Sequence, residues 1–102
     1  MRIAKVIGLV TLNRCVKETR RGRYLIAEAF DRRALTGRSQ HHGRAAPMPE
    51  SLVVFDDLGA GIGQIIAVSE GREASMPFYP EHVCIDAYNT AILDHVEFDS
   101  PE

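Results

Sequence analysis

The sequence contains no tryptophan, and aromatic side chains make up only 7% of its 102 residues. Proteins that bind single-stranded nucleic acid by base stacking need exposed aromatic side chains, so this scarcity disfavours that class. Neither sign of charge dominates, because 12 basic residues stand against 14 acidic ones and leave a net charge of −2. The sequence therefore lacks the strongly basic composition that is typical of proteins bound to nucleic acid or to anionic membranes.

The sequence also lacks the features of a secreted or membrane protein. Arg2 and Lys5 interrupt the apolar N-terminus, and the uncharged stretch 6–12 is short for a secretory signal. No apolar window approaches the roughly 20 residues of a membrane-spanning helix. Cys15 and Cys84 form no C-x-x-C pair and have no ligand cluster beside them. We therefore expect a cytoplasmic protein with two reduced thiols and no membrane contact.

What the sequence does contain is five short segments rich in branched and aromatic residues, the pattern of β-strands. These segments are Arg2–Leu12, Arg23–Asp31, Ser51–Asp57, Gln64–Gly71 and Thr90–Phe98. No stretch has a long helical period, and short helical turns are expected only at 72–75 and around 86–89. The sequence predicts an all-β fold: a small five-stranded OB-like β-barrel with one or two short helical turns.

The first predicted strand is apolar on both faces. Its even positions carry Ala4, Val6, Val10 and Leu12, and its odd positions carry Ile3, Ile7 and Leu9 around the charged Lys5. Strands with one solvated face alternate apolar and polar residues. We therefore expect both faces of this strand to be covered.

A polar, basic segment separates the second and third predicted strands. The segment 32–50 is long for a loop in a compact domain, so we expect it either to be mobile or to have a role in function. It contains His41 and His42, but adjacent histidines on a polar loop are usually solvated, and we predict no metal site.

We interpret residues 1–98 as one domain and residues 99–102 as a tail.

The most distinctive motif is the glycine-rich segment Gly59-Ala60-Gly61-Ile62-Gly63-Gln64 between two predicted strands. Its spacing differs from the G-x-G-x-x-G of dinucleotide-binding folds, and it has no lysine in the P-loop position. The residues that follow have strand character, so the helix N-terminus that would hold a phosphate is missing. We predict a tight turn without a cofactor, in which glycine permits positive φ and a close approach of another backbone.

No catalytic signature stands out either. Serine, histidine and aspartate occur, but without a G-x-S-x-G nucleophile elbow. Asp56 and Asp57 form a carboxylate pair at a strand end, where capping and solvation are the usual roles. The sequence therefore predicts a protein that is not an enzyme.

Three segments, MRIAKVIGLV, DDLGAGIGQIIAVSEG and CIDAYNTAILDHV, follow one another in an order that resembles the EutN/CcmL family. This family comprises the vertex proteins of bacterial microcompartment shells. The matching positions are Met1, Ile3, Ala4, Val6 and Gly8, then Gly59 through Gly63, and finally Asp86, Ala87, Ile92 and Asp94. The sequence departs from the family at Gln64, where an acidic residue is usual.

The resemblance implies a structural protein located in the shell of a cytoplasmic microcompartment. Family members have an OB-like barrel, and five copies close each vertex of a shell built from hexameric and pseudohexameric proteins of another fold. We therefore expect the chain to bind itself as a homopentamer and to contact those shell proteins, with Gly59–Gln64 near the pentamer contacts. The second apolar face of the first strand is suited to such an interface, because heterologous contacts repeated around an axis close a ring.

The residues leave one alternative from another class, an OB-fold protein that binds single-stranded nucleic acid. Five basic side chains concentrate in one predicted hairpin, namely Arg14, Lys17, Arg20, Arg21 and Arg23. That function also needs exposed aromatic rings, whereas Tyr24, Phe30 and Phe55 fall where strand cores are expected. We favour the shell protein, which binds no nucleic acid, and interpret the basic run as a solvated loop or as a rim facing acidic neighbours.

Overall fold

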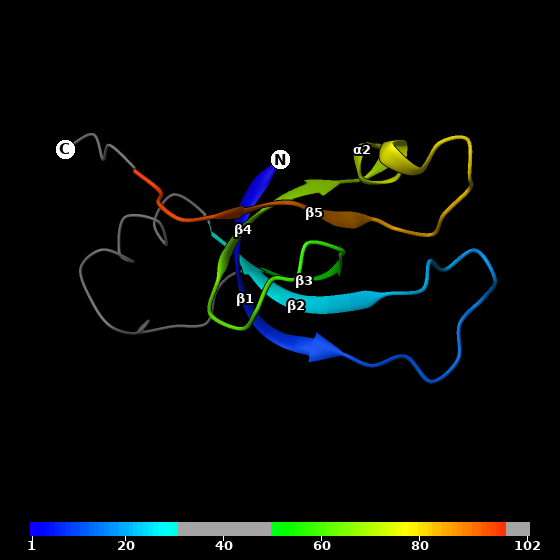
Figure 1. Ribbon diagram of the computed structural model, residues 1–102, viewed down its shortest axis with the longest axis horizontal. Coiled ribbons are helices and arrows are strands. Elements are labelled where there is room, and N and C mark those ends of the chain that lie inside the picture. The colour runs from blue at the N-terminus through cyan, green and yellow to red at the C-terminus, as the bar shows by residue number, and fades with distance from the viewer. Residues whose placement is uncertain (31–49, 98–102) are drawn as a thin grey trace.

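The computed structural model describes residues 1–30 and 50–97, whose five strands close into a β-barrel (Figure 1). The strands are β1 (Arg2–Val10), β2 (Arg23–Ala29), β3 (Glu50–Asp56), β4 (Ile65–Glu70) and β5 (Ala87–Leu93). They follow the order β1-β2-β3-β5-β4 around the barrel, and every neighbouring pair except β3 and β5 is antiparallel. The predicted all-β, five-stranded barrel is confirmed. The predictions for 32–49, His41, His42 and the 99–102 tail lie outside the described residues.

The fifth strand differs from its prediction. The alternation over Thr90–Phe98 suggested a strand there and a helical turn around 86–89, but β5 begins at Ala87 and ends at Leu93. Val96 follows the strand, and Phe98 lies outside the described residues. The sequence signal was misleading because Asn89, a residue with little preference for strands, is buried in β5 by its hydrogen bond to Asp56.

The helical turn predicted at 72–75 is confirmed as α2 (Arg72–Ser75), which follows β4 directly. Gly71 permits this tight junction because its φ of 67° is unfavourable for other residues. A 3-10 turn, η1 (Met76–Phe78), continues from α2, and Pro77 suits its first turn, where a missing N–H costs nothing. The sequence analysis missed η1.

Small and branched side chains fill the barrel interior. Leu25, Val54 and Ile66 are fully buried, and each contributes about 1.5–3 kcal/mol relative to an exposed position. Alanines occupy the spaces between them, so the strands can approach across a narrow barrel. The complete interior cluster comprises Ala4, Val6, Leu25, Ala27, Val54, Ala60, Ile66, Val68 and Ala87.

A second cluster, made largely of aromatic rings, lies on the outside of the barrel beneath η1. The ring of Phe55 contacts Tyr24 edge-on at 5.2 Å between centroids and stacks on Tyr88 at 6.0 Å. Phe78 of η1 meets Tyr88 edge-on at 5.1 Å. Such pairs contribute about 0.5–1.5 kcal/mol beyond their buried area. The cluster therefore attaches η1 and the following loop to the barrel.

Only part of β1 is covered in the single chain. Ala4 and Val6 are fully buried, whereas Ile7 and Leu9 are 40% and 55% exposed. The pairing with β2 shifts between Val6 and Gly8, which marks a β-bulge at this point. Within the single chain one face is therefore covered, and cover of the other face, which carries Ile7 and Leu9, stays a prediction.

The barrel closes where β3 meets β5, and this seam has the least backbone pairing. A single pair, Phe55 with Tyr88, is in register between these two parallel strands. Side chains reinforce it: Asn89 Nδ2 donates to Asp56 Oδ1 at 2.8 Å, and the Tyr88 hydroxyl donates to the Asp57 carboxylate at 2.9 Å. The seam thus depends on side chains more than on the backbone ladder.

Candidate functional site

The glycine turn between β3 and β4 is organised by the buried carboxylate of Asp56. Its oxygens accept hydrogen bonds from the backbone N–H groups of Leu58 at 3.1 Å, Gly59 at 3.1 Å and Ala60 at 3.0 Å. Aspartate favours this position because its short side chain reaches N–H groups two to four residues ahead. The capping role expected for the Asp56 and Asp57 pair is thus fulfilled by Asp56.

Side chains from two further strands donate hydrogen bonds to the same carboxylate. Arg23 Nη1 of β2 donates to Asp56 Oδ2 at 2.7 Å, and Asn89 Nδ2 of β5 donates to Oδ1 at 2.8 Å. Burial alone would raise the pKa of Asp56, but the hydrogen bonds from Asn89 and from the backbone of the turn outweigh it and hold the pKa below its ordinary value. Asp56 is therefore an ionised group that joins β2, β3, β5 and the turn.

Glycine's conformational freedom is needed at two positions of the turn. Gly59 has a φ of 92° and Gly63 a φ of 96°, which other residues rarely adopt. Gly61 lies between them without a positive φ, and a Cβ built on it would meet only Gln64 Oε1, at 3.8 Å. Within the single chain, neither conformation nor space requires glycine at position 61.

The turn is fastened to β1 of the same chain. Gly63 N–H donates to the Val6 carbonyl at 2.8 Å, and Val6 N–H donates to the Gln64 carbonyl at 2.9 Å. Gln64 also stabilises the turn internally, because its Oε1 accepts from Gly61 N–H at 2.7 Å. These bonds place the turn beside the β-bulge and next to the exposed Ile7.

The six predicted site residues divide by exposure. The side chain of Ala60 is fully buried in the barrel interior, whereas Ile62 is 67% exposed. Gly61 is half-buried, and the remaining members of the turn are exposed, namely Gly59, Gly63 and Gln64. Contact of this turn with a second subunit stays a prediction, and any such contact would be made by residues other than Ala60.

The backbone N–H groups at the start of the turn already have an acceptor within the chain. In a phosphate-binding loop, consecutive backbone N–H groups point at the anion. Here three consecutive N–H groups, from Leu58 to Ala60, already bind the carboxylate of Asp56. A phosphate would have to displace that buried carboxylate.

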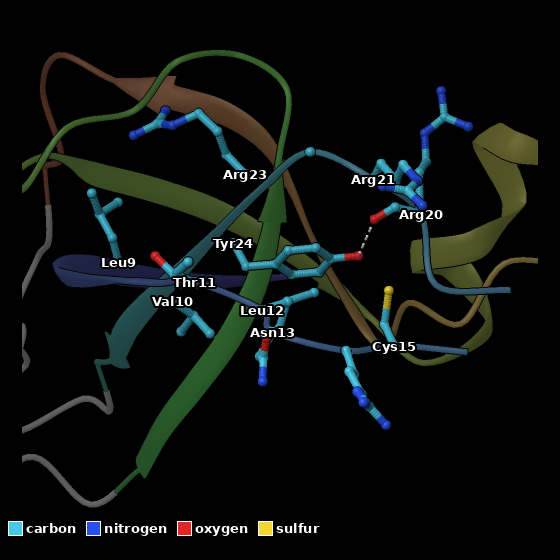
Figure 2. A pocket seen from close by; sticks show the side chains of 12 residues that line it. Leu9, Val10, Thr11, Leu12, Asn13, Cys15, Arg20, Arg21, Arg23 and Tyr24 are labelled. Carbon is cyan, nitrogen blue, oxygen red and sulfur yellow. Dashed lines mark hydrogen bonds between the residues drawn. The ribbon is translucent and has the colours of Figure 1, made fainter. Parts of the chain in front are cut away.

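A cleft of about 710 Å³ lies at the base of the long loop between β1 and β2 (Figure 2). Arg20 is engaged within the chain: its guanidinium lies 4.6 Å above the centre of the Phe78 ring and contacts Glu81 at 3.3 Å. The Tyr24 hydroxyl donates to the Arg20 carbonyl at 2.6 Å. Arg23 binds Asp56, so two of the five basic residues predicted to form one patch are occupied by intramolecular contacts.

The aromatic side chains within residues 1–30 and 50–97 do not form a stacking platform. Tyr24, Phe30 and Phe55 are buried, as expected from the sequence. Phe78 and Tyr88 are half-buried in the aromatic cluster. Among the aromatic residues that the structure describes, only Tyr79 is largely exposed, at 76%. A single exposed ring does not favour the nucleic-acid-binding alternative.

Within residues 1–30 and 50–97, no group of three histidine, cysteine, aspartate or glutamate side chains gathers as a metal site would require. No helix in these same ranges has the length and apolar character to span a membrane.

An ion pair joins β1 and β4 at one end of their pairing. Arg2 Nε and Nη2 donate to the two oxygens of Glu70 at 2.7 and 3.0 Å, the bidentate geometry of a strong pair. The hydrogen bond from Arg2 is the main reason that the pKa of Glu70 lies below its ordinary value of 4.5. Glu70 and Asp56 thus both favour the ionised form in the folded state.

We expect the protein to lose stability in acid. Because the pKa values of Asp56 and Glu70 are lower in the folded state, their stabilising effect is complete above their ordinary values of 3.8 and 4.5 and disappears as the pH falls through the folded pKa values. Urea midpoints should be constant from neutral pH to about pH 5 and fall below about pH 4. The decline should be smaller in Glu70→Gln. A midpoint that rises on acidification would contradict this assignment.

A family model described as ethanolamine utilisation protein EutN/carboxysome matches residues 1–94. The chain belongs to the EutN/CcmL family. It is similar to the GrpN pentameric microcompartment shell protein from Rhodospirillum rubrum, with 28% identity over 97% of this chain and 100% of that one and a TM-score of 0.73. It is also similar to the pentameric shell protein MSM0273 from the RMM microcompartment, with 25% identity over 100% of both chains and a TM-score of 0.75.

CcmL from Gloeobacter violaceus has the same fold, with a TM-score of 0.76 and 24% identity over 97% of this chain and 91% of that one. The comparison with curated protein sequences gives no significant match.

The three EutN/CcmL motifs of this chain meet in space. Val6 of the first motif is hydrogen-bonded to Gly63 and Gln64 of the second. Asp56, which begins the second motif, is hydrogen-bonded to Asn89 of the third. Sequence reasoning identified the glycine turn but missed Arg23 and Asn89 as partners of Asp56, because these residues are distant in sequence and match no short motif.

Proposed function

We propose that this chain is a structural protein that caps the vertices of a bacterial microcompartment shell as a homopentamer. The observation that carries the proposal is the likeness, over nearly the whole chain, to two pentameric shell proteins at 28% and 25% identity. Relatives of this kind are structural proteins, and we accordingly propose no catalytic activity for this one.

The pentamer contact is proposed to include the glycine turn and the neighbouring part of β1. The five described strands close on one another, which favours subunit contacts through side chains and loops. Exposed apolar side chains adjoin this region: Ile62 is 67% exposed, Ile7 40% and Leu9 55%. Burying them against a second copy of the chain would remove apolar surface from water.

The ring is proposed to be heterologous, with the turn of one subunit against a different surface of the next. Such contacts close around an axis when the rotation between subunits permits it. This arrangement leaves the basic loop available to other partners, since Arg14, Lys17 and Arg21 are exposed.

We propose that the pentamer meets hexameric and pseudohexameric shell proteins and that the assembled shell lies in the cytoplasm.

We expect purified protein to have a native mass five times that of the 11.3 kDa chain. Native mass spectrometry measures the subunit number, and size exclusion with light scattering checks it in solution. A chain that stays monomeric at high micromolar concentration would contradict the vertex function. If that monomer also bound single-stranded DNA tightly in added salt, the OB-fold alternative would be supported instead.

A further inference from the structure

Two loops far apart in the sequence lie together at one end of the barrel (Figure 1). One joins β1 to β2, and the other joins η1 to β5. Their backbones are hydrogen-bonded directly, because Cys84 N–H donates to the Glu18 carbonyl at 2.9 Å. Arg20 of the first loop also contacts Phe78 of η1 and Glu81 of the second loop. The two loops are therefore held in a defined relation in the folded chain.

Each of these loops carries one of the two cysteines of the chain. Cys15 and Cys84 are both exposed and both are free thiols. Cys84 itself donates the backbone hydrogen bond to Glu18 that joins the two loops. Cys15 lies just before a turn closed by Thr19 N–H on the Val16 carbonyl at 3.0 Å, which folds the chain back toward Glu18.

Tyr24 of β2 is a neighbour of Cys15, and both thiols influence its pKa. Burial is the largest reason that the pKa of Tyr24 is raised, and the nearby Cys15 and Cys84 raise it further. Figure 2 shows the Cys15 side chain beside the hydroxyl end of Tyr24. Cys15 of the first loop thus lies beside β2, and Cys84 of the second loop is bonded to Glu18, three residues after Cys15.

We propose that Cys15 and Cys84 form an intramolecular disulfide when the chain meets a low-molecular-weight disulfide, and that this bond locks the two loops together. A disulfide requires closely spaced Cα atoms, and the hydrogen bond between Cys84 and Glu18 sets Cys84 against the first loop, three residues along the chain from Cys15. The exposure of both thiols gives the oxidant access. The proposed disulfide would thus be a redox-sensitive cross-link on the loop that carries the basic residues.

The chemistry consists of two thiol–disulfide exchanges. One protein thiolate attacks a sulfur of the reagent, forms a mixed disulfide and releases the first small thiol. The second protein thiolate then attacks the protein sulfur of that mixed disulfide and releases the second small thiol. The two cysteines lose two electrons, the reagent gains them, and the two thiol protons end on the released small thiols.

The test is to incubate the full chain with oxidised glutathione and compare it with the reduced protein. Alkylation and mass spectrometry should show two labelled thiols before treatment and none afterwards, with a loss of about 2 Da and no retained glutathione. A digest should contain the Cys15–Cys84 peptide pair. The melting temperature should rise by several degrees, because the bond closes a long loop of the unfolded chain, and reductant should reverse the rise.

Single variants provide the matched controls. Cys15→Ser and Cys84→Ser should each retain one glutathione as a mixed disulfide and show no such rise in melting temperature. Stable glutathione on both cysteines of the wild-type chain would overturn the proposal, as would a disulfide between two chains on a non-reducing gel. The result does not depend on the pentamer, because the intramolecular bond is scored by peptide mapping in any assembly state.

Discussion

Replacing Asp56 with alanine is expected to destabilise the fold by about 3 kcal/mol or more. The change removes the acceptor of the Leu58, Gly59 and Ala60 N–H groups and of the Asn89 side chain. The Ala60 bond and the Asn89 bond are buried, so water cannot readily replace the lost carboxylate. Because small domains are stable by only about 5–15 kcal/mol, a large share of the folding free energy should disappear.

Urea unfolding of Asp56→Ala beside Asp57→Ala tests this expectation. Asp57 is the adjacent carboxylate, but it is exposed, and it accepts hydrogen bonds from the Tyr88 hydroxyl. Its removal should cost less than about 1 kcal/mol. Asp56→Asn should fall between the two, because one oxygen remains as an acceptor. Equal unfolding midpoints for Asp56→Ala and Asp57→Ala would show that the capping network contributes little.

Gly61→Val is expected to reduce the yield of pentamer while leaving the barrel folded. The reason is that Gly61 has no positive φ and a Cβ there meets only Gln64 Oε1, at 3.8 Å. The single chain can therefore accept the side chain. A neighbouring subunit packed against the turn cannot, and the clash would recur at every contact of the ring. Size exclusion with light scattering measures the assembly, and circular dichroism measures the fold.

Gly63→Ala is the matched control for that experiment. Gly63 has a φ of 96°, and a Cβ built on it would meet no described atom within 4 Å, so the strained backbone alone should make alanine there destabilise the chain by about 1–2 kcal/mol. The two glycine variants should thus separate, one affecting assembly and the other the melting temperature. Normal assembly of Gly61→Val would leave the pentamer intact as a proposal but would remove the glycine turn from its contact surface.

The strands and the glycine turn could be predicted because their signals are local. Runs of branched and aromatic residues identify β1 through β4, and three glycines within five residues predict the turn between β3 and β4. The role of Gly61 could not be read in the same way. Which glycines need a positive φ depends on the path that Asp56 imposes on the turn, and the structure places that need at Gly59 and Gly63.

The contacts that join distant segments were beyond the reach of the sequence. Asn89 is a polar residue inside a strand, and nothing near it signals that its partner is Asp56, on another strand of the barrel. The same polar residue hid the start of β5. Likewise, both faces of β1 have apolar residues, so composition could not tell the core side, Ala4 and Val6, from the exposed side with Ile7 and Leu9.

The weak backbone pairing at the β3–β5 seam makes this the place where local opening of the barrel should begin. Local opening begins where the fewest backbone bonds must break together, and between these strands a single in-register pair, Phe55 with Tyr88, holds the ladder. Transient excursions of β5 would loosen the Asp56–Asn89 bond first and so reach the glycine turn. The lifetime of this one seam would then set how long the turn keeps its shape between encounters with another subunit.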